Sequence, residues 1–122
     1  VEFRIADTSV QAIDFDTLNW DQASARANSL NSVPGTVYLV RDPMVWAVSG
    51  FARKGQYAVV AYDGRMAGVL AHELGHVLGA DDRYFWNGTS WGCQTSPDIM
   101  CVASLVTTLS QQTLSEINGA GW

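Results

Sequence analysis

Two histidines and three acidic residues lie close together in the middle of the chain, where the sequence reads HELGHVLGADD from residue 72 to residue 82. His72 and His76 are four residues apart, so in a helix they occupy the same face. Both imidazoles can then direct a nitrogen at one zinc ion, at about 2.0–2.1 Å. Glu73 would lie beside the metal rather than on it. That is the position that a general base for a metal-activated water requires.

A third metal ligand is expected shortly after these two histidines. Gly79 suits the end of a helix, because glycine readily adopts a positive φ. The chain can then double back, so that Asp82 presents its carboxylate to the metal. Three protein ligands and one open position are typical of a catalytic zinc site. The chain has two histidines in all and both belong to this motif, which argues against a chance arrangement on a surface helix.

Length and composition indicate one folded domain. The chain has 122 residues, of which 48% are hydrophobic and 16% charged, in the range of globular proteins. The net charge is −5, and the seven Lys and Arg residues form no basic cluster. Nucleic acid and anionic membrane surfaces are therefore not expected as partners. No apolar run approaches the roughly 20 residues that span a bilayer.

The chain has two cysteines, Cys93 and Cys101. They lack the C-x-x-C spacing that is typical of zinc ligands, so a disulfide between them is the better interpretation. Such a disulfide would place the protein in an oxidising compartment. We therefore expect a secreted protein, made as a precursor.

The elements that position the motif are predicted from periodicity and from turn residues. We expect a helix over residues 17–30, the helix that carries the histidines after Gly64, and a final short helix at 110–118 with Ser110 as its cap. Strands are expected at residues 1–6, 36–40, 44–51 and 56–62, and an irregular aromatic loop at 83–96. Small residues form a stripe along the central helix, which would let another backbone approach it closely: Gly68, Ala71, Gly75 and Gly79.

The motif resembles that of the metzincin clan of zinc peptidases, H-E-x-x-H-x-x-G-x-x-H followed by a methionine turn. Asp82 stands where that clan has its last histidine. In this the chain looks like the snapalysin family, small secreted bacterial neutral peptidases with aspartate as third ligand. Tyr84, two residues after that aspartate, is similar to the family's stretch, and Ile99-Met100 lies where a methionine turn should.

The resemblance implies an α+β fold: a twisted, mostly parallel sheet of four to five strands, with a backing helix and an active-site helix. Residues 1–122 would form a single zinc metalloprotease catalytic domain. Residues 1–79 would lie above the cleft, and residues 80–122 would form a small irregular C-terminal part with the methionine turn and a final helix. An antiparallel edge strand, for which residues 45–52 are the candidate, would bind an extended peptide by strand addition.

The resemblance also implies a function, that of a zinc-dependent endopeptidase with one catalytic Zn²⁺. Glu73 would take a proton from the zinc-bound water and pass it to the leaving amine. Tyr84 would hydrogen-bond the tetrahedral oxyanion, or else be a half-buried loop tyrosine. Met100 would form an apolar floor under the zinc, or else be an ordinary core methionine. The expected partner is a protein or peptide substrate cleaved before a bulky apolar residue, and the enzyme should be a monomer. No residue is assigned to a structural Ca²⁺ ion.

Three alternatives stay open. Glu116 lies on a later helix, as the third ligand does in thermolysin-like enzymes. Asp98 would correspond to the distant aspartate of the aspartate-ligand fungal peptidases. Both rank below Asp82, because they leave Gly79 without a role. The third alternative is a secreted zinc-binding module or an inactive protease homologue, against which Glu73 argues, since a structural site gains nothing from a base beside the metal.

Overall fold

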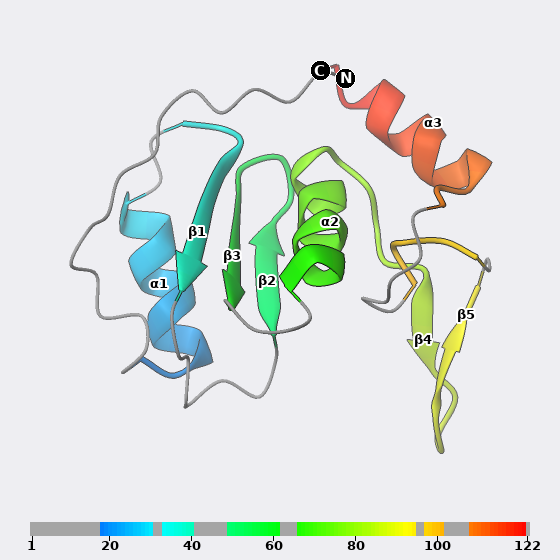
Figure 1. The fold of residues 1–122 in the computed structure, drawn as a ribbon, viewed down its shortest axis with the longest axis horizontal. Coiled ribbons are helices and arrows are strands. Elements are labelled where there is room, and N and C mark those ends of the chain that lie inside the picture. The colour runs from blue at the N-terminus through cyan, green and yellow to red at the C-terminus, as the bar shows by residue number, and fades with distance from the viewer. Residues whose placement is uncertain are drawn as a thin grey trace.

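The computed structural model describes residues 18–30, 33–40, 49–61, 66–94, 97–101 and 108–121. Their fold is α+β (Figure 1). The elements, in chain order, are α1 (Trp20–Leu30), β1 (Thr36–Val40), β2 (Gly50–Arg53), β3 (Tyr57–Ala61), α2 (Met66–Val77), β4 (Tyr84–Trp86), β5 (Trp91–Cys93) and α3 (Gln111–Gly119). The strand expected at residues 1–6, and residues 44–48 of another, lie outside the described ranges. No helix within those ranges is long and apolar enough to cross a bilayer.

The larger sheet has three strands in the order β1-β3-β2. Strand β1 pairs with β3 in parallel, from Thr36 opposite Tyr57, whereas β2 is antiparallel to β3, with Gly50 opposite Val60. The prediction of a mostly parallel sheet is therefore wrong for the described strands, which form a mixed sheet. The reason is the short turn between β2 and β3, where Gly55 has a φ of 73°. A connection of three residues returns the chain directly beside itself and so makes the pair antiparallel.

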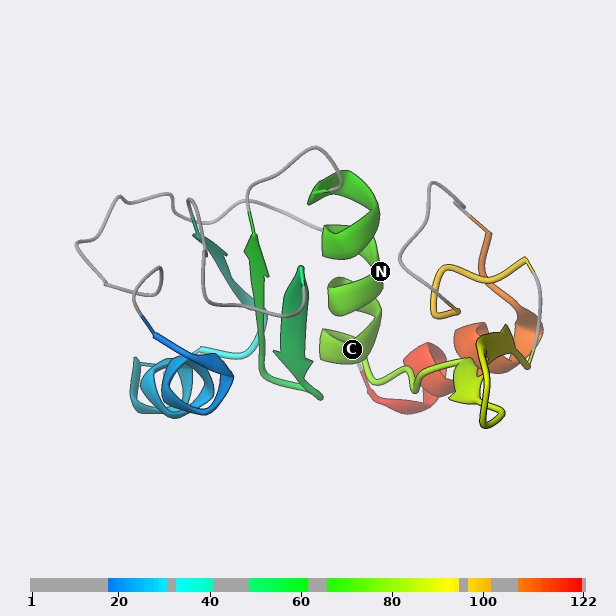
Figure 2. The same cartoon turned by 90° about the horizontal axis from the view of Figure 1, so that it is seen from below.

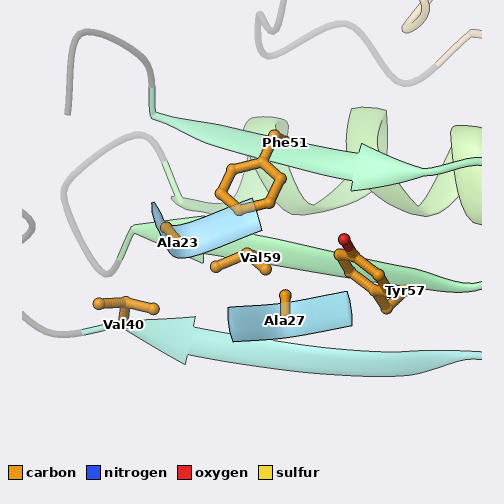
Figure 3. Close-up of a cluster of buried hydrophobic side chains, with 6 residues drawn as sticks. All are labelled: Ala23, Ala27, Val40, Phe51, Tyr57 and Val59. Atoms are coloured by element: carbon orange, nitrogen blue, oxygen red, sulfur yellow. The ribbon is translucent and has the colours of Figure 1, made fainter. Parts of the chain in front are cut away.

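The sheet is covered by a helix on each face (Figure 2). Side chains alternate along β3, so Tyr57 and Val59 pack with Ala23 and Ala27 of α1 (Figure 3). Ala58 and Val60 belong to a second cluster, together with two residues of α2, Val69 and Val77. All five residues of β3 are buried, which accounts for a strand without polar positions. The predicted backing helix and buried strand are both confirmed.

The chain after α2 contains regular structure that the sequence did not predict. The aromatic loop expected at residues 83–96 includes an antiparallel pair, β4 with β5, in which Trp86 lies opposite Trp91. The turn between these strands is stabilised by Asn87, whose side-chain oxygen accepts hydrogen bonds from the backbone N–H groups of Thr89 and Ser90 at 2.9 Å. Helix α3 begins after Ser110, whose hydroxyl accepts a hydrogen bond from the N–H of Thr113. The predicted cap is therefore confirmed.

Candidate metal centre

Helix α2 ends at Val77, and Gly79 terminates it as the sequence predicts. This glycine has a φ of 109°. Its N–H donates to the carbonyl of His76, and the N–H of Ala80 donates to the carbonyl of Gly75, both at 2.9 Å. The two bonds form a Schellman motif, which satisfies the last carbonyls of the helix and reverses the chain. A side chain at residue 79 would also approach the Cβ of Ala120 to 2.7 Å.

The reversal brings the three predicted ligands together. The Oδ1 atom of Asp82 lies 3.2 Å from the Nε2 atom of His72 and 3.1 Å from the Nε2 atom of His76. One ligand atom from each residue lies within 4.8 Å of the others, so the three residues form a group that can hold a metal ion. Asp81 points elsewhere, since its carboxylate pairs with Lys54 at 2.6 Å.

The other nitrogen of each imidazole faces a backbone carbonyl. The Nδ1 atom of His72 lies 2.9 Å from the carbonyl oxygen of Ile99, and that of His76 lies 3.0 Å from the carbonyl oxygen of Ala80. A carbonyl can only accept a hydrogen bond, so Nδ1 carries the proton in both rings. The Nε2 atom of each ring is then the one that faces the space between the ligands. Backbone partners of this kind hold metal-ligating histidines in the required tautomer and orientation.

The residues present fit a bound cation. The Oδ1 atom of Asp82 is buried without a hydrogen-bond partner, and it faces the Nε2 atoms of both histidines at 3.2 and 3.1 Å. Burial acts to raise the pKa of Asp82, but His72 and His76 hold it well below its usual range. Burial likewise acts to lower the pKa of His76, yet the carboxylate of Asp82 and the carbonyl of Ala80 raise it overall. Both shifts reflect the attraction between the carboxylate and the imidazoles, and a carboxylate that stays ionised is suited to bind a cation.

Glu73 lies in the same pocket but outside the ligand group. The pocket has a volume of about 370 Å³ and is lined by α2, by β2 and by the chain from residue 81 to residue 84. Glu73 is 7% exposed, and burial raises its pKa against the opposing effect of the two histidines. Gly50 of β2 lies against it, because an added Cβ there would approach the Cγ atom of Glu73 to 3.2 Å. A buried carboxylate with a raised pKa is suited to accept and return a proton.

Tyr84 also lines this pocket. Its ring stacks on that of His72, with centroids 6.0 Å apart and an angle of 24° between the planes. Burial raises the pKa of its hydroxyl, and so do the charge of Asp82, a hydrogen bond to Asp82 and the charge of Glu73. The hydroxyl therefore remains protonated and lies near both carboxylates. Tyr84 is half-buried and also lines the pocket. Its position therefore suits both expected roles, a hydrogen-bond donor to the oxyanion and a half-buried loop tyrosine.

Met100 supports the helix from below. It is fully buried, and a Cβ added to Gly75 would overlap its sulfur atom. The side chain of the methionine therefore lies against the small-residue stripe of α2 at Gly75, one residue before His76. Its neighbour Ile99 supplies the carbonyl that orients His72. The turn at residues 98–101 thus places an apolar side chain and a hydrogen-bond acceptor under the two histidines.

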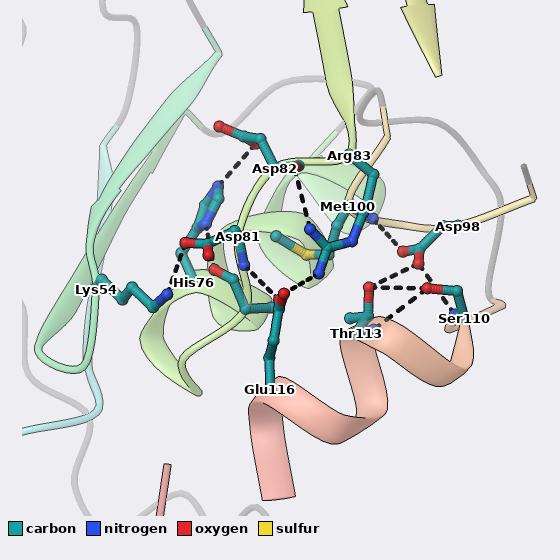
Figure 4. A network of polar contacts seen from close by, with 11 residues as sticks. Lys54, His76, Asp81, Asp82, Arg83, Asp98, Met100, Ser110, Thr113 and Glu116 are labelled. Atoms are coloured by element: carbon teal, nitrogen blue, oxygen red, sulfur yellow. Dashed lines mark hydrogen bonds and ion pairs between the residues drawn. The ribbon is translucent and has the colours of Figure 1, made fainter. Parts of the chain in front are cut away.

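The two alternative ligands are engaged elsewhere (Figure 4). Glu116 forms an ion pair with Arg83 and accepts a hydrogen bond from the N–H of Asp81 at 2.9 Å. Asp98 is 1% exposed and accepts hydrogen bonds from the N–H groups of Met100 and Ser110 and from the hydroxyl of Thr113. Within the described residues, neither joins the metal-ligand group.

Arg83 and the disulfide complete the site's support. Arg83 is 3% exposed, and its backbone N–H donates to the carbonyl of Met100 at 2.7 Å. The sequence analysis did not predict this supporting role. The only available signal was an arginine directly after the proposed ligand. Cys93 and Cys101 form the predicted disulfide, with their Cα atoms 5.4 Å apart. It links β5 to the turn that carries Met100.

No protein-family model, curated protein or solved structure matches this chain. The resemblance to snapalysins therefore rests on the motif residues and their spacing. A fold by itself does not specify a function, so the function has to be argued from the geometry and chemistry of the site.

Proposed function

We propose that the protein is a zinc-dependent endopeptidase of the snapalysin type. One observation carries the proposal: three ligand atoms from His72, His76 and Asp82 converge, and the carboxylate of Glu73 lies beside them in one pocket. A site that only binds metal has no use for a buried carboxylate that is not a ligand. A hydrolase needs one there as a base.

The donor set favours zinc. Two imidazole nitrogens and one carboxylate oxygen, with room for a further ligand, are typical of catalytic zinc sites. When bound, zinc would polarise the scissile carbonyl and lower the pKa of a bound water towards neutrality. Asp82 contributes a negative charge that a third histidine would not. The site is therefore less electrophilic than one with three histidines.

The chain's own residues supply the remaining steps. Glu73 accepts the proton of the attacking water and delivers it to the leaving amine. Tyr84, whose hydroxyl remains protonated, donates a hydrogen bond to the oxyanion of the tetrahedral intermediate. Strand β2 forms the edge of the described sheet and borders the pocket, so an extended substrate can pair with it. Secretion and a monomeric state belong to the same proposal.

The decisive test is Glu73→Gln, which keeps the shape of the side chain and removes its basicity. We expect hydrolysis of casein to be abolished while one zinc ion per chain is retained, as measured by atomic absorption. The wild-type protein should lose casein hydrolysis to a chelator and regain it with Zn²⁺. A zinc-loaded wild-type protein that cleaves neither casein nor a peptide library would instead be a zinc-binding module or an inactive homologue. Loss of zinc in the variant would show that Glu73 is a ligand.

A further inference from the structure

The hairpin of β4 and β5 presents aromatic side chains to solvent. Trp86 and Trp91 are 55% and 61% exposed, although they lie directly opposite each other in the pair. Their ring centroids are 5.4 Å apart, and the ring of Tyr84 lies 5.3 Å from that of Trp91. Tyr84 and Trp86 are two residues apart in one strand, so all three side chains share one face. We call Tyr84, Trp86 and Trp91 the aromatic strip.

The aromatic strip is continuous with the candidate metal centre. Tyr84 stacks on His72 and lines the pocket that contains Glu73. From there the ring contacts run outward along the hairpin to Trp91 and Trp86. Phe85 lies on the opposite face, where its ring covers Gly92. An exposed apolar surface that adjoins a cleft is typical of a binding site.

We propose, on the basis of the endopeptidase function above, that the aromatic strip binds apolar side chains of the substrate several residues away from the scissile bond. The strip contains no charged side chain, so it is suited to apolar groups. It lies beside the pocket that β2 borders. Ring-to-ring steps of 6.0, 5.3 and 5.4 Å match roughly three to five residues of extended chain at about 3.3 Å each.

The surface is also built to be rigid. Cross-strand aromatic pairs stabilise a hairpin, and the disulfide from Cys93 to Cys101 anchors the end of β5. Aromatic side chains held in place lose little conformational freedom when a ligand binds, which favours binding. The substrate class is therefore a polypeptide with clustered apolar residues on one side of the cleaved bond.

The test uses two peptides with the same cleavable bond, cut by the full-length, zinc-loaded protein. The first peptide carries Leu and Phe three to five residues from that bond, and it is made in two versions, one for each side of the bond. The second peptide carries Ser at the same positions. We expect the wild-type protein to cleave one apolar version with a KM about tenfold lower than that of its serine counterpart. In the double variant Trp86→Thr, Trp91→Thr the two KM values should become equal, with kcat unchanged. Threonine is chosen because it retains β-propensity.

Phe85→Thr is the matched control, since it removes an exposed aromatic ring from the other face of the same hairpin. It should keep the tenfold preference, and circular dichroism should show that all variants are folded. Tryptophan fluorescence can monitor peptide binding to the Glu73→Gln variant. This measures the affinity of the aromatic strip for the peptide without cleavage. Equal cleavage of both peptides by the wild-type protein, or an equal loss of preference in Phe85→Thr, would overturn the inference and leave the endopeptidase intact.

Two further outcomes separate the two proposals. If no peptide is cleaved but apolar peptides still bind Glu73→Gln through the tryptophans, the endopeptidase proposal fails and the binding surface stands. Tight binding of a chitin oligosaccharide, abolished in the double variant, with no discrimination between the peptides, would assign the strip to carbohydrate and overturn the inference.

Discussion

The parts of the molecule before and after Gly79 are held together in different ways. Up to α2, the described chain is a layered structure in which β3 is buried on both faces by apolar packing. Beyond Gly79, an apolar cluster that also includes Leu78 of the first part is supplemented by a disulfide and by buried polar residues, Arg83 and Asp98. The candidate metal centre spans the boundary: both histidines come from the first part, and Asp82 comes from the second.

This difference has a consequence for the site. Helical geometry places His72 and His76 relative to each other, whatever lies around them. Asp82 has no regular element to hold it. Its position depends on the Gly79 turn before it and on the contacts of Asp81 and Arg83 on either side. Changes in the two parts should therefore affect the protein in different ways, stability in the first and metal binding in the second.

The largest effect is expected for Asp82→Ala, which removes the ligand from the second part. We predict a loss of zinc affinity of more than about 100-fold, because removing a ligand should exceed the 10–100-fold effect of removing an outer partner. Asp81→Ala is the matched control, since it removes a neighbouring carboxylate that pairs with Lys54. Competition with a chromogenic chelator measures both. Equal affinities for the two variants would exclude Asp82 as the third ligand.

The second prediction concerns the contact between the two parts under the helix. Gly75→Ala forces a methyl group into the space that the sulfur atom of Met100 occupies. We expect a loss of about 1–3 kcal/mol in the free energy of unfolding, the usual range for overpacking. Gly119→Ala is the control, because a Cβ there would meet nothing within 4 Å. It should cause no loss, since alanine favours a helix more than glycine does.

Urea denaturation in the presence of a chelator compares these two variants without a contribution from metal. If Gly75→Ala is as stable as Gly119→Ala, the methionine turn is not packed against the helix. The histidines would then lack the support that we describe.

The sequence predicted the first part and the motif better than the rest. Apolar residues at helical spacing located α1, α2 and α3, and runs of β-forming or apolar residues located β1 and β3. The cap at Ser110 and the turn at Gly79 were recognised from residue type alone. The hairpin at residues 84–93 was missed because its aromatic strip is exposed. Without a buried face, alternation between apolar and polar residues is absent, and the segment was interpreted as a loop.

Some contributions to the site could not be predicted in this way. Glu116 and Asp98 were considered as ligands because thermolysin-like enzymes carry the third ligand on a later helix and the aspartate-ligand fungal peptidases use a distant aspartate. The structure instead places them in contacts with Arg83 and with the start of α3. These contacts join residues far apart in the sequence. Spacing along one chain carries no information about such pairs.

The third prediction tests whether Glu116 holds the ligand loop. Glu116→Ala removes the acceptor for the N–H of Asp81 and the partner of Arg83. We expect zinc affinity to fall about tenfold, as for other outer partners of metal ligands, while the stoichiometry remains one ion per chain. Glu116→Gln should recover most of the affinity, because its side-chain oxygen still accepts a hydrogen bond. Loss of stoichiometric zinc in the alanine variant alone would instead make Glu116 a ligand.

The smallest effect is expected for Asp98, which stabilises the second part without touching the metal. Burial acts to raise its pKa, but hydrogen bonds from Ser110, Thr113 and Met100 lower it overall. A carboxyl whose pKa is lower in the folded state stabilises the fold above its unfolded pKa of about 3.9 and loses that contribution as the pH falls through the folded value. Asp98→Asn should therefore lower the free energy of unfolding by about 1 kcal/mol at pH 6. In urea titrations with chelator present, the difference in unfolding free energy between the wild type and this variant should shrink as the pH falls below about 4. A difference that is constant with pH would show that the charge of Asp98 contributes nothing to stability.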